Sequence, residues 1–195
     1  MHVPTPTRLR PVLVAALLGI ITGVAGVAAQ GQTTTETKVS KNWSPPAEKI
    51  YAQALCDAIM KAHAELLSVT LHGSPPGYSG IYTMFAGSYP ERIGNPDDPD
   101  DVDVITKGIT IVDPRWHRTR DPVPKFVVQL PLRDAAGENI GLIVLAYKVP
   151  APVGDGATEV EFFRRAARLR DALKPRIPSF AALFKPAGAQ SARSD

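Results

Sequence analysis

The stretch that decides the fold is KFVVQLPLRDAAGENIGLIVLAYKV, residues 125–149, in which two apolar runs flank a short polar turn. The runs at 126–132 and 140–149 have the length and composition of β-strands. Gly137 tolerates the positive φ of a tight turn, and Gly141 marks a bulge or a close backbone approach. Both runs are apolar on both faces, so we expect a hairpin inside a covered sheet.

Upstream of the hairpin, we predict a long amphipathic helix over residues 46–69. Ser44 can cap its start, and prolines suit the first helical positions. The helix should stop at HGSPPG, residues 72–77, where glycine and two prolines prevent continuation. The apolar positions recur at steps of three and four residues: Ala47, Ile50, Tyr51, Ala54, Leu55, Ala58, Ile59, Ala62, Leu66 and Val69.

Shorter elements complete the pattern. We predict strands over 81–85 and 109–113, and between them a helix over 99–107, capped by an aspartate and ended by Gly108. A C-terminal helix should span 158–174 and be followed by an apolar helical turn at 179–184. Its expected apolar stripe consists of Val160, Phe163, Ala167, Leu169 and Leu173.

Composition narrows the function classes. The 195 residues suffice for one domain with a core. Removing Arg8 and Arg10 with the first 29 residues lowers the formal charge from +3 to +1, which argues against nucleic-acid binding. Cys56 is the only cysteine, so an internal disulfide and cysteine-rich metal sites are excluded. We expect it to be buried in the helix.

Residues 1–29 have the architecture of a secretory signal peptide. Arg8 and Arg10 precede an apolar run, and Ala29 ends a small-residue cleavage site. The alternative is an uncleaved anchor, because residues 11–29 almost span a bilayer. Polar residues 30–44 read as a flexible linker. We therefore expect a periplasmic or secreted protein with no stable membrane insertion after cleavage.

Two segments resemble the extracytoplasmic sensor domains of the Cache and PAS-like group. Residues 92–108 start with Arg-x-Gly and continue into an acidic stretch, and Trp116 follows. The hairpin has the Pro-Leu-x-Asp-x-x-Gly-x-x-x-Gly pattern, carried by Pro131, Leu132, Asp134, Gly137 and Gly141. The resemblance implies an α+β domain at 45–150 with an antiparallel sheet of about five strands, a long N-terminal helix on it and a small-molecule ligand over its concave face.

Residues 151–195 complete the predicted domain organisation. Residues 151–185 should form a C-terminal helical segment of the domain, and 186–195 a disordered tail. Typical members of the group lie between two membrane helices and drive an output domain, and this sequence shows neither. A separate partner, such as a membrane-bound sensor or transporter, is therefore expected. The alternative is a cell-envelope interaction protein whose pocket is filled by side chains.

The candidate ligand-binding residues are Trp116, Arg118, Arg120, Tyr82 and Phe85. The loop PRWHRTRD combines an aromatic wall with guanidinium groups, which recognise carboxylates well. This favours a small, anionic ligand, and the alternative is an exposed basic loop packed by one tryptophan. No cofactor is expected. The motifs of serine hydrolases, zinc proteases and nucleotide-binding proteins do not occur, so we do not expect an enzyme.

Two possible metal sites stay open. The acidic segment 97–103 offers hard oxygen ligands for calcium, but its spacing does not fit an EF-hand, and helix capping in a solvated loop explains the same residues. Cys56, Met60 and His63 share one flank of the predicted helix and would suit haem or copper. A partly buried helix face with cysteine as a small hydrophobe is the favoured explanation.

The signal-peptide interpretation predicts a defined mature N-terminus. Signal peptidase should cut after Ala29, because small residues occupy the positions it reads, so the exported protein should begin at Gln30. Mass spectrometry of the protein from an envelope fraction measures this directly. An intact N-terminus in the membrane pellet would contradict the prediction and indicate an anchor.

Overall fold

The computed structural model describes residues 39–115, 124–149 and 156–188, all within a compact unit that spans residues 38–195. The elements, with η for 3-10 helices, are α1 (Tyr51–Ala62), β1 (Leu66–Gly73), β2 (Thr83–Gly87), η1 (Pro90–Arg92), α2 (Pro99–Lys107), β3 (Ile111–Pro114), β4 (Lys125–Arg133), β5 (Asn139–Lys148), α3 (Gly156–Leu173), η3 (Lys174–Arg176) and η4 (Phe180–Phe184).

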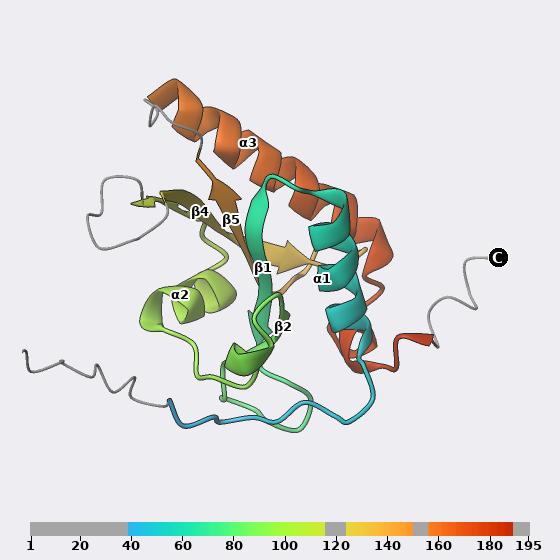
Figure 1. The fold of residues 1–195 in the computed structure, drawn as a ribbon. Coiled ribbons are helices and arrows are strands. Elements are labelled where there is room, and N and C mark those ends of the chain that lie inside the picture. Colours follow the sequence, from blue (N-terminus) through green and yellow to red (C-terminus); the bar gives the residue numbers. More distant parts are fainter. Residues whose placement is uncertain (1–38, 116–123, 150–155, 189–195) are drawn as a thin grey trace, which may run out of the picture. The chain divides into compact units, whose positions relative to one another are not determined.

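The five strands form one antiparallel sheet in the order β2-β1-β5-β4-β3 (Figure 1). The hairpin of the opening stretch is β4 and β5, and β5 is the central strand. In its turn, the Gly137 amide donates to the Asp134 carbonyl at 2.9 Å, and Gly137 has φ 92°. This sheet and the helices packed on it confirm the predicted α+β class with an antiparallel sheet of five strands.

One face of the sheet carries the hydrophobic core. Phe126, Val128 and Leu130 of β4 point toward it and are covered by α3, while α1 covers the same core at β1 and β2. Phe162 of α3 stacks on Phe126 with ring centroids 5.1 Å apart. Helix α1 buries Ala52, Leu55, Cys56 and Ile59 in the same cluster. Burial of these side chains, at about 1.5–3 kcal/mol for each large one, is the main stabilisation of the fold.

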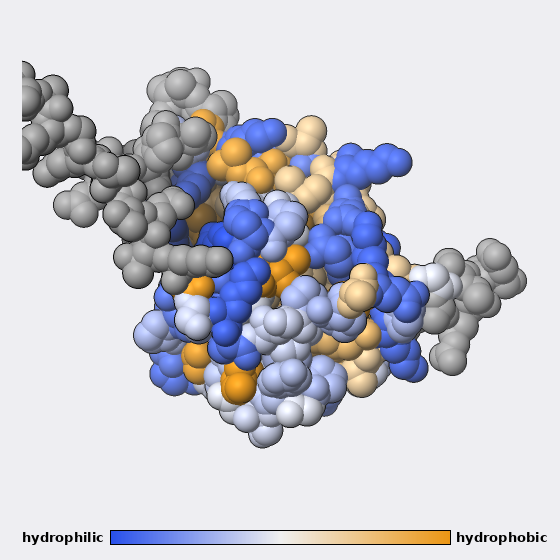
Figure 2. All heavy atoms as spheres, turned by 60° about the horizontal axis from the view of Figure 1, so that its bottom comes forward, coloured by the Kyte–Doolittle hydropathy of each residue, from blue (hydrophilic) through white to orange (hydrophobic). Residues whose placement is uncertain are grey.

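The opposite face is mixed in character and lies under α2 (Figure 1). Val104 of α2 and Leu142 of β5 are fully buried there, outside the main core cluster. The neighbouring positions of β1 and β4 are polar. Turning the molecule of Figure 1 by 60° brings forward a surface dominated by hydrophilic side chains, with smaller hydrophobic areas between them (Figure 2).

The long helix predicted over residues 46–69 is wrong at both ends. Ile50 forms a bridge with Pro186, so the helix starts only at Tyr51. It stops at Ala62, and Leu66 already belongs to β1. Leu66 and Val69 continue the three-residue apolar step of the helix, but the segment pairs with β2 and β5 on its two sides, and this pairing overrides the local pattern.

The other predicted elements are close to the observed ones, except for the face of the C-terminal helix. Helix α2 has the predicted bounds, an Asp98 N-cap with a capping box, and Gly108 in the left-handed conformation at its end. In α3, however, Phe162 is buried, whereas Val160 and Phe163 of the predicted stripe are exposed. Phe162 and Phe163 are adjacent, and either one fits the apolar period of a helix. The sequence pattern therefore selects the wrong one of the two for the buried stripe.

Gly141 provides a test of the strand packing. A Cβ added there would lie 2.5 Å from the His72 carbonyl oxygen on the neighbouring strand β1. We expect Gly141→Ala to lower the free energy of unfolding by about 1–3 kcal/mol, because the two strands must move apart. Urea denaturation followed by circular dichroism measures the loss. Gly188→Ala, where no atom lies within 4 Å of the new Cβ, is the matched control, and equal stability of both variants would contradict the close approach.

Candidate functional site

A pocket of about 170 Å³ lies on the polar face of the sheet. Its floor is made by side chains from the three strands β1, β5 and β4, namely Ser68, Thr70, His72, Val144, Ala146 and Gln129. The polar members of this floor are each less than a tenth exposed. A buried polar floor under a helix is unusual, because burying an unpaired polar group costs free energy. These side chains must therefore have partners or a ligand.

The strand register explains why the polar residues meet. Ser68, Thr70 and His72 alternate with core residues along β1, so they share one face. Thr70 lies opposite Val144 of β5, and Val144 lies opposite Gln129 of β4. One row across the sheet thus contains the Thr70 hydroxyl, the Val144 side chain and the Gln129 carboxamide, in this order.

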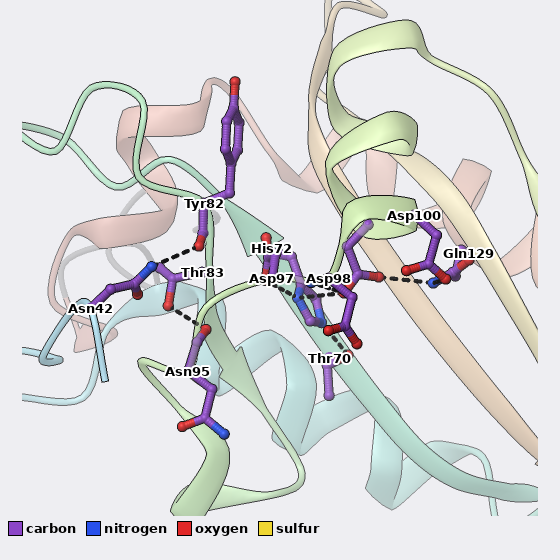
Figure 3. A network of polar contacts seen from close by, with 11 residues as sticks. Asn42, Thr70, His72, Tyr82, Thr83, Asn95, Asp97, Asp98, Asp100 and Gln129 are labelled. Atoms are coloured by element: carbon purple, nitrogen blue, oxygen red, sulfur yellow. Dashed lines mark hydrogen bonds and ion pairs between the residues drawn. The ribbon is translucent and has the colours of Figure 1, made fainter. Parts of the chain in front are cut away.

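His72 lies at the centre of a network of hydrogen bonds between the pocket floor and the acidic segment 97–103 (Figure 3). Its Nε2 lies 2.7 Å from the Thr70 hydroxyl, and its Nδ1 lies 2.7 Å from Asp97 Oδ1. When Nδ1 of a neutral imidazole donates to the Asp97 carboxylate, Nε2 accepts from the Thr70 hydroxyl. Asp97, whose side chain is fully buried, thereby orients the imidazole.

The segment before α2 is pinned so that Asp97 reaches His72. Thr83 of β2 donates its hydroxyl to the Asn95 carbonyl at 2.8 Å, and the Asp97 amide donates to the Tyr82 carbonyl at 3.2 Å (Figure 3). Since Met84 of β2 pairs with His72 of β1, this anchoring brings the acidic segment over the polar floor.

Asp101 is the second buried carboxylate of the site. Gln129 Nε2 donates to Asp101 Oδ1 at 2.8 Å and to Asp100 Oδ2 at 3.2 Å. Asp101 Oδ2 lies 3.9 Å from His72 Nδ1. Burial raises the pKa of Asp101 above its ordinary value, His72 opposes the rise, and the Asp97 and Asp100 carboxylates add to it.

The other side chains of the pocket include three cations, Arg92, Arg115 and Lys125. Lys125 is the first residue of β4 and lies on the same face as Gln129, four residues before it. Arg115 directly follows β3, which pairs with β4. Arg115 Nε donates to Asp113 Oδ2 at 2.6 Å. The pocket therefore has an acidic end beneath α2 and a basic end toward the start of β4.

Of the five predicted ligand-binding residues, the two that the structure describes, Tyr82 and Phe85, do not line this pocket. Trp116, Arg118 and Arg120 lie outside the described residues. Tyr82 contributes its carbonyl to the network, but its side chain points away from His72 (Figure 3). Phe85 lies in the core against Phe180 and Phe184, on the far face of the sheet from the pocket. Adjacent strand residues face opposite ways, so it is Met84 that lines the pocket.

The predicted flank of Cys56, Met60 and His63 is divided between core and surface. Cys56 is fully buried, as expected, and burial raises the pKa of its thiol. His63 ends α1 and lies 3.0 Å from Glu65 Oε1. In the described ranges, the groups of three metal-ligating side chains in mutual reach are His72 with Asp97 and Asp101, and Asp98 with Asp100 and Asp101.

Thr70, His72 and Gln129 are the site residues that the sequence did not reveal. The sequence predicts His72 at the end of the long helix, and helix capping in a solvated loop for the acidic segment 97–103. The first prediction is wrong because His72 belongs to β1. The second is confirmed for the capping residue Asp98 and the exposed Asp100, and is wrong for Asp97 and Asp101, which are buried against β1. The available signal was the alternation of Ser68, Thr70 and His72 with apolar residues.

Comparisons with known proteins give likenesses of the fold only. No protein-family model and no curated protein matches the chain. The E. coli DcuS sensor domain matches with 18% identity and a TM-score of 0.34, over 57% of this chain and 71% of that one. The A. aeolicus nlh2 GAF domain in an inactive state matches with 10% identity and a TM-score of 0.47, over 70% and 85%. A GAF domain region from Geobacter sulfurreducens PCA matches with 12% identity and a TM-score of 0.40, over 62% and 89%.

None of the helices in the described ranges combines the length and apolar character needed to cross a bilayer.

Asp101 gives the site a testable pH dependence. Its pKa is raised from 3.8 in the folded protein, so the folded state keeps the proton to a higher pH than the unfolded chain. This contribution to stability is present at low pH and is lost as the pH rises through the folded pKa. We expect Asp101→Asn, which cannot ionise, to gain stability relative to the wild type between pH 3 and pH 7.

Urea denaturation at both pH values, in a chelating buffer, measures this gain. Asp103→Asn removes an exposed carboxylate of the same helix, paired with Lys107, and serves as control. If the difference between Asp101→Asn and the wild type is the same at both pH values, burial does not govern the titration of Asp101.

Proposed function

We propose that this chain is a sensor-like module that binds a small molecule with an anionic group in the pocket between α2 and the sheet. The observation that carries the proposal is the buried polar floor made by Ser68, Thr70, His72 and Gln129. A face that served only to pack α2 would be apolar. Convergent polar groups around a hollow are typical of small-molecule sites.

The basic end of the pocket supports an anionic ligand. Arg115 and Lys125 lie at this end, and Arg92 also lines the pocket; cationic donors form the strongest hydrogen bonds with carboxylates. The rest of the ligand would meet the Thr70 hydroxyl and the Gln129 carboxamide. The pocket is smaller than the roughly 300–1,000 Å³ of drug-sized sites, which favours a ligand of few atoms.

We further propose a binding role without catalysis, in a periplasmic or secreted location. The signal-like architecture of residues 1–29 supports export. A binding module of this kind would pass its state to a partner, such as a membrane-bound sensor or transporter. The competing function is an interaction protein that uses the same fold without a ligand.

A ligand screen tests the proposal. The purified full chain would be examined by thermal shift against short monocarboxylates, dicarboxylates and amino acids. A compound that binds only the folded state stabilises it by about 2.7 kcal/mol at a hundredfold excess over its dissociation constant. For a binding compound, we expect Arg115→Gln and Gln129→Leu each to weaken affinity by about tenfold or more, because each removes a hydrogen bond, in one case to a charged group.

Arg164→Gln is the matched control, because Arg164 is exposed on α3 and does not line this pocket. Its affinity should equal that of the wild type. A flat screen with folded protein, or an equal loss in all three variants, would overturn the proposal and favour the interaction protein.

A further inference from the structure

The acidic end of the pocket has an unbalanced charge. Asp97 has no exposed side-chain surface, and Asp101 is nearly as buried. Among the described residues, the basic group in contact with both is the single imidazole of His72, at 2.7 Å and 3.9 Å. One imidazole, even protonated, does not balance two buried carboxylates, and buried charge without compensation is costly.

Two buried oxygen atoms at the same place have no hydrogen-bond donor in the described part of the chain. They are Asp97 Oδ2 and Gln129 Oε1, in side chains that both contact the cluster through their other atom. Native structures leave few buried polar atoms unsatisfied, and each such atom calls for a reason. Asp97 Oδ2 is a carboxylate oxygen of the cluster itself, so a positive ion bound beside His72 and Asp101 supplies the partner that another carboxylate or carbonyl would not.

We propose that His72 Nδ1, Asp97 and Asp101 bind a divalent transition-metal ion. Atoms that ligate one such ion lie about 2.0–2.2 Å from it and therefore at most about 4.2 Å from each other. The separations of 2.7 Å from His72 Nδ1 to Asp97 Oδ1 and 3.9 Å to Asp101 Oδ2 satisfy this limit. All three ligand atoms lie within 4.8 Å of one another, so small side-chain movements complete the site.

The surrounding hydrogen bonds hold each ligand in a suitable orientation. A metal-bound imidazole donates its other N–H to an acceptor, and Thr70 Oγ1 lies 2.7 Å from His72 Nε2. Gln129 holds Asp101 by Oδ1, which leaves Oδ2 on the side of His72 apart from a long bond of 3.4 Å from the Asp98 amide. On binding, the proton leaves Nδ1 and Nε2 carries one, so Thr70 changes from donor to acceptor.

The ligand set selects among metals. One imidazole with two carboxylates suits Zn²⁺, Mn²⁺ or Fe²⁺, whereas Ca²⁺ requires six to eight oxygen ligands. The imidazole thus separates this site from the calcium loop considered for residues 97–103. The inference does not depend on the proposed organic ligand, because the three side chains are sufficient to hold the ion.

Isothermal titration of the metal-stripped full chain with Zn²⁺, in the absence of any carboxylate compound, tests the site. We expect one ion per chain, and at least a roughly tenfold loss of affinity in His72→Gln and in Asp97→Asn, since even supporting residues cost 10–100-fold. Thr70→Val should also weaken binding, by about tenfold. Titrations with Ca²⁺ and Mg²⁺ should give much weaker binding.

Two controls exclude other sites. His63→Gln removes the imidazole that contacts Glu65, and Asp103→Asn removes an exposed carboxylate of α2; both should bind Zn²⁺ like the wild type. No binding, or loss in His63→Gln with retention in His72→Gln, would overturn the inference. Should the His72 and Asp97 variants lose their circular dichroism signal, the zinc X-ray absorption spectrum of the wild type decides: one imidazole with oxygen donors supports the site, and sulfur or several imidazoles refute it.

Discussion

The two-residue alternation along β1 is the constraint on which the rest of the molecule depends. Val69 and Leu71 enter the core, whereas Thr70 and His72 face α2. Because β1 pairs with β2 on one side and β5 on the other, its register fixes what both neighbours place on each face. A shift by one residue would bury the hydroxyl and imidazole in the core and expose the leucine, so the apolar face enforces the position of the polar one.

Burying the carboxylates of the polar face costs free energy, and hydrogen bonds from several elements at once offset this cost. Asp97 is set by hydrogen bonds to the start of β2, and Asp101 by the capping box of α2 and by Gln129. Such a network is stabilising when every member is satisfied and costly when one partner is lacking. Its remaining unpaired oxygens therefore locate the position where the protein alone is incomplete, at the acidic end of the pocket.

Much of the fold could be predicted from local patterns, and most of the site could not. The hairpin of residues 125–149 combines apolar runs with a Gly137 turn, and α2 has its cap and its Gly108 stop, so each carries its own signals. The start of β1 does not, since Leu66 and Val69 fit a helical step as well as a strand. This ambiguity is the reason why the sequence did not predict the site. His72 comes close to Asp97 only when residues 66–73 form the strand β1.

Burial of the acidic segment illustrates the same limit in electrostatic terms. A run with five aspartates between residues 97 and 103 is solvated in isolation, and nothing local distinguishes Asp97 and Asp101 from Asp103, which stays exposed. The distinction comes from His72 and Gln129, which lie 25 and 28 residues away along the chain. Likewise, Phe85 and Met84 are adjacent, and only the register of the sheet decides which one enters the core and which one the pocket.

The pocket also connects several elements of the fold. Its acidic end joins three segments that are otherwise separate: β1 through His72, the stretch after η1 through Asp97, and α2 through Asp101. Any positive charge gained or lost there changes the attraction between α2 and the sheet, because the carboxylate of Asp101 is one of the links between them. An anion at the basic end acts on Lys125 and Arg115, at the start of β4 and the end of β3. The two ends thus contact different elements over one floor, and α2 contributes only two buried side chains, Val104 and Asp101.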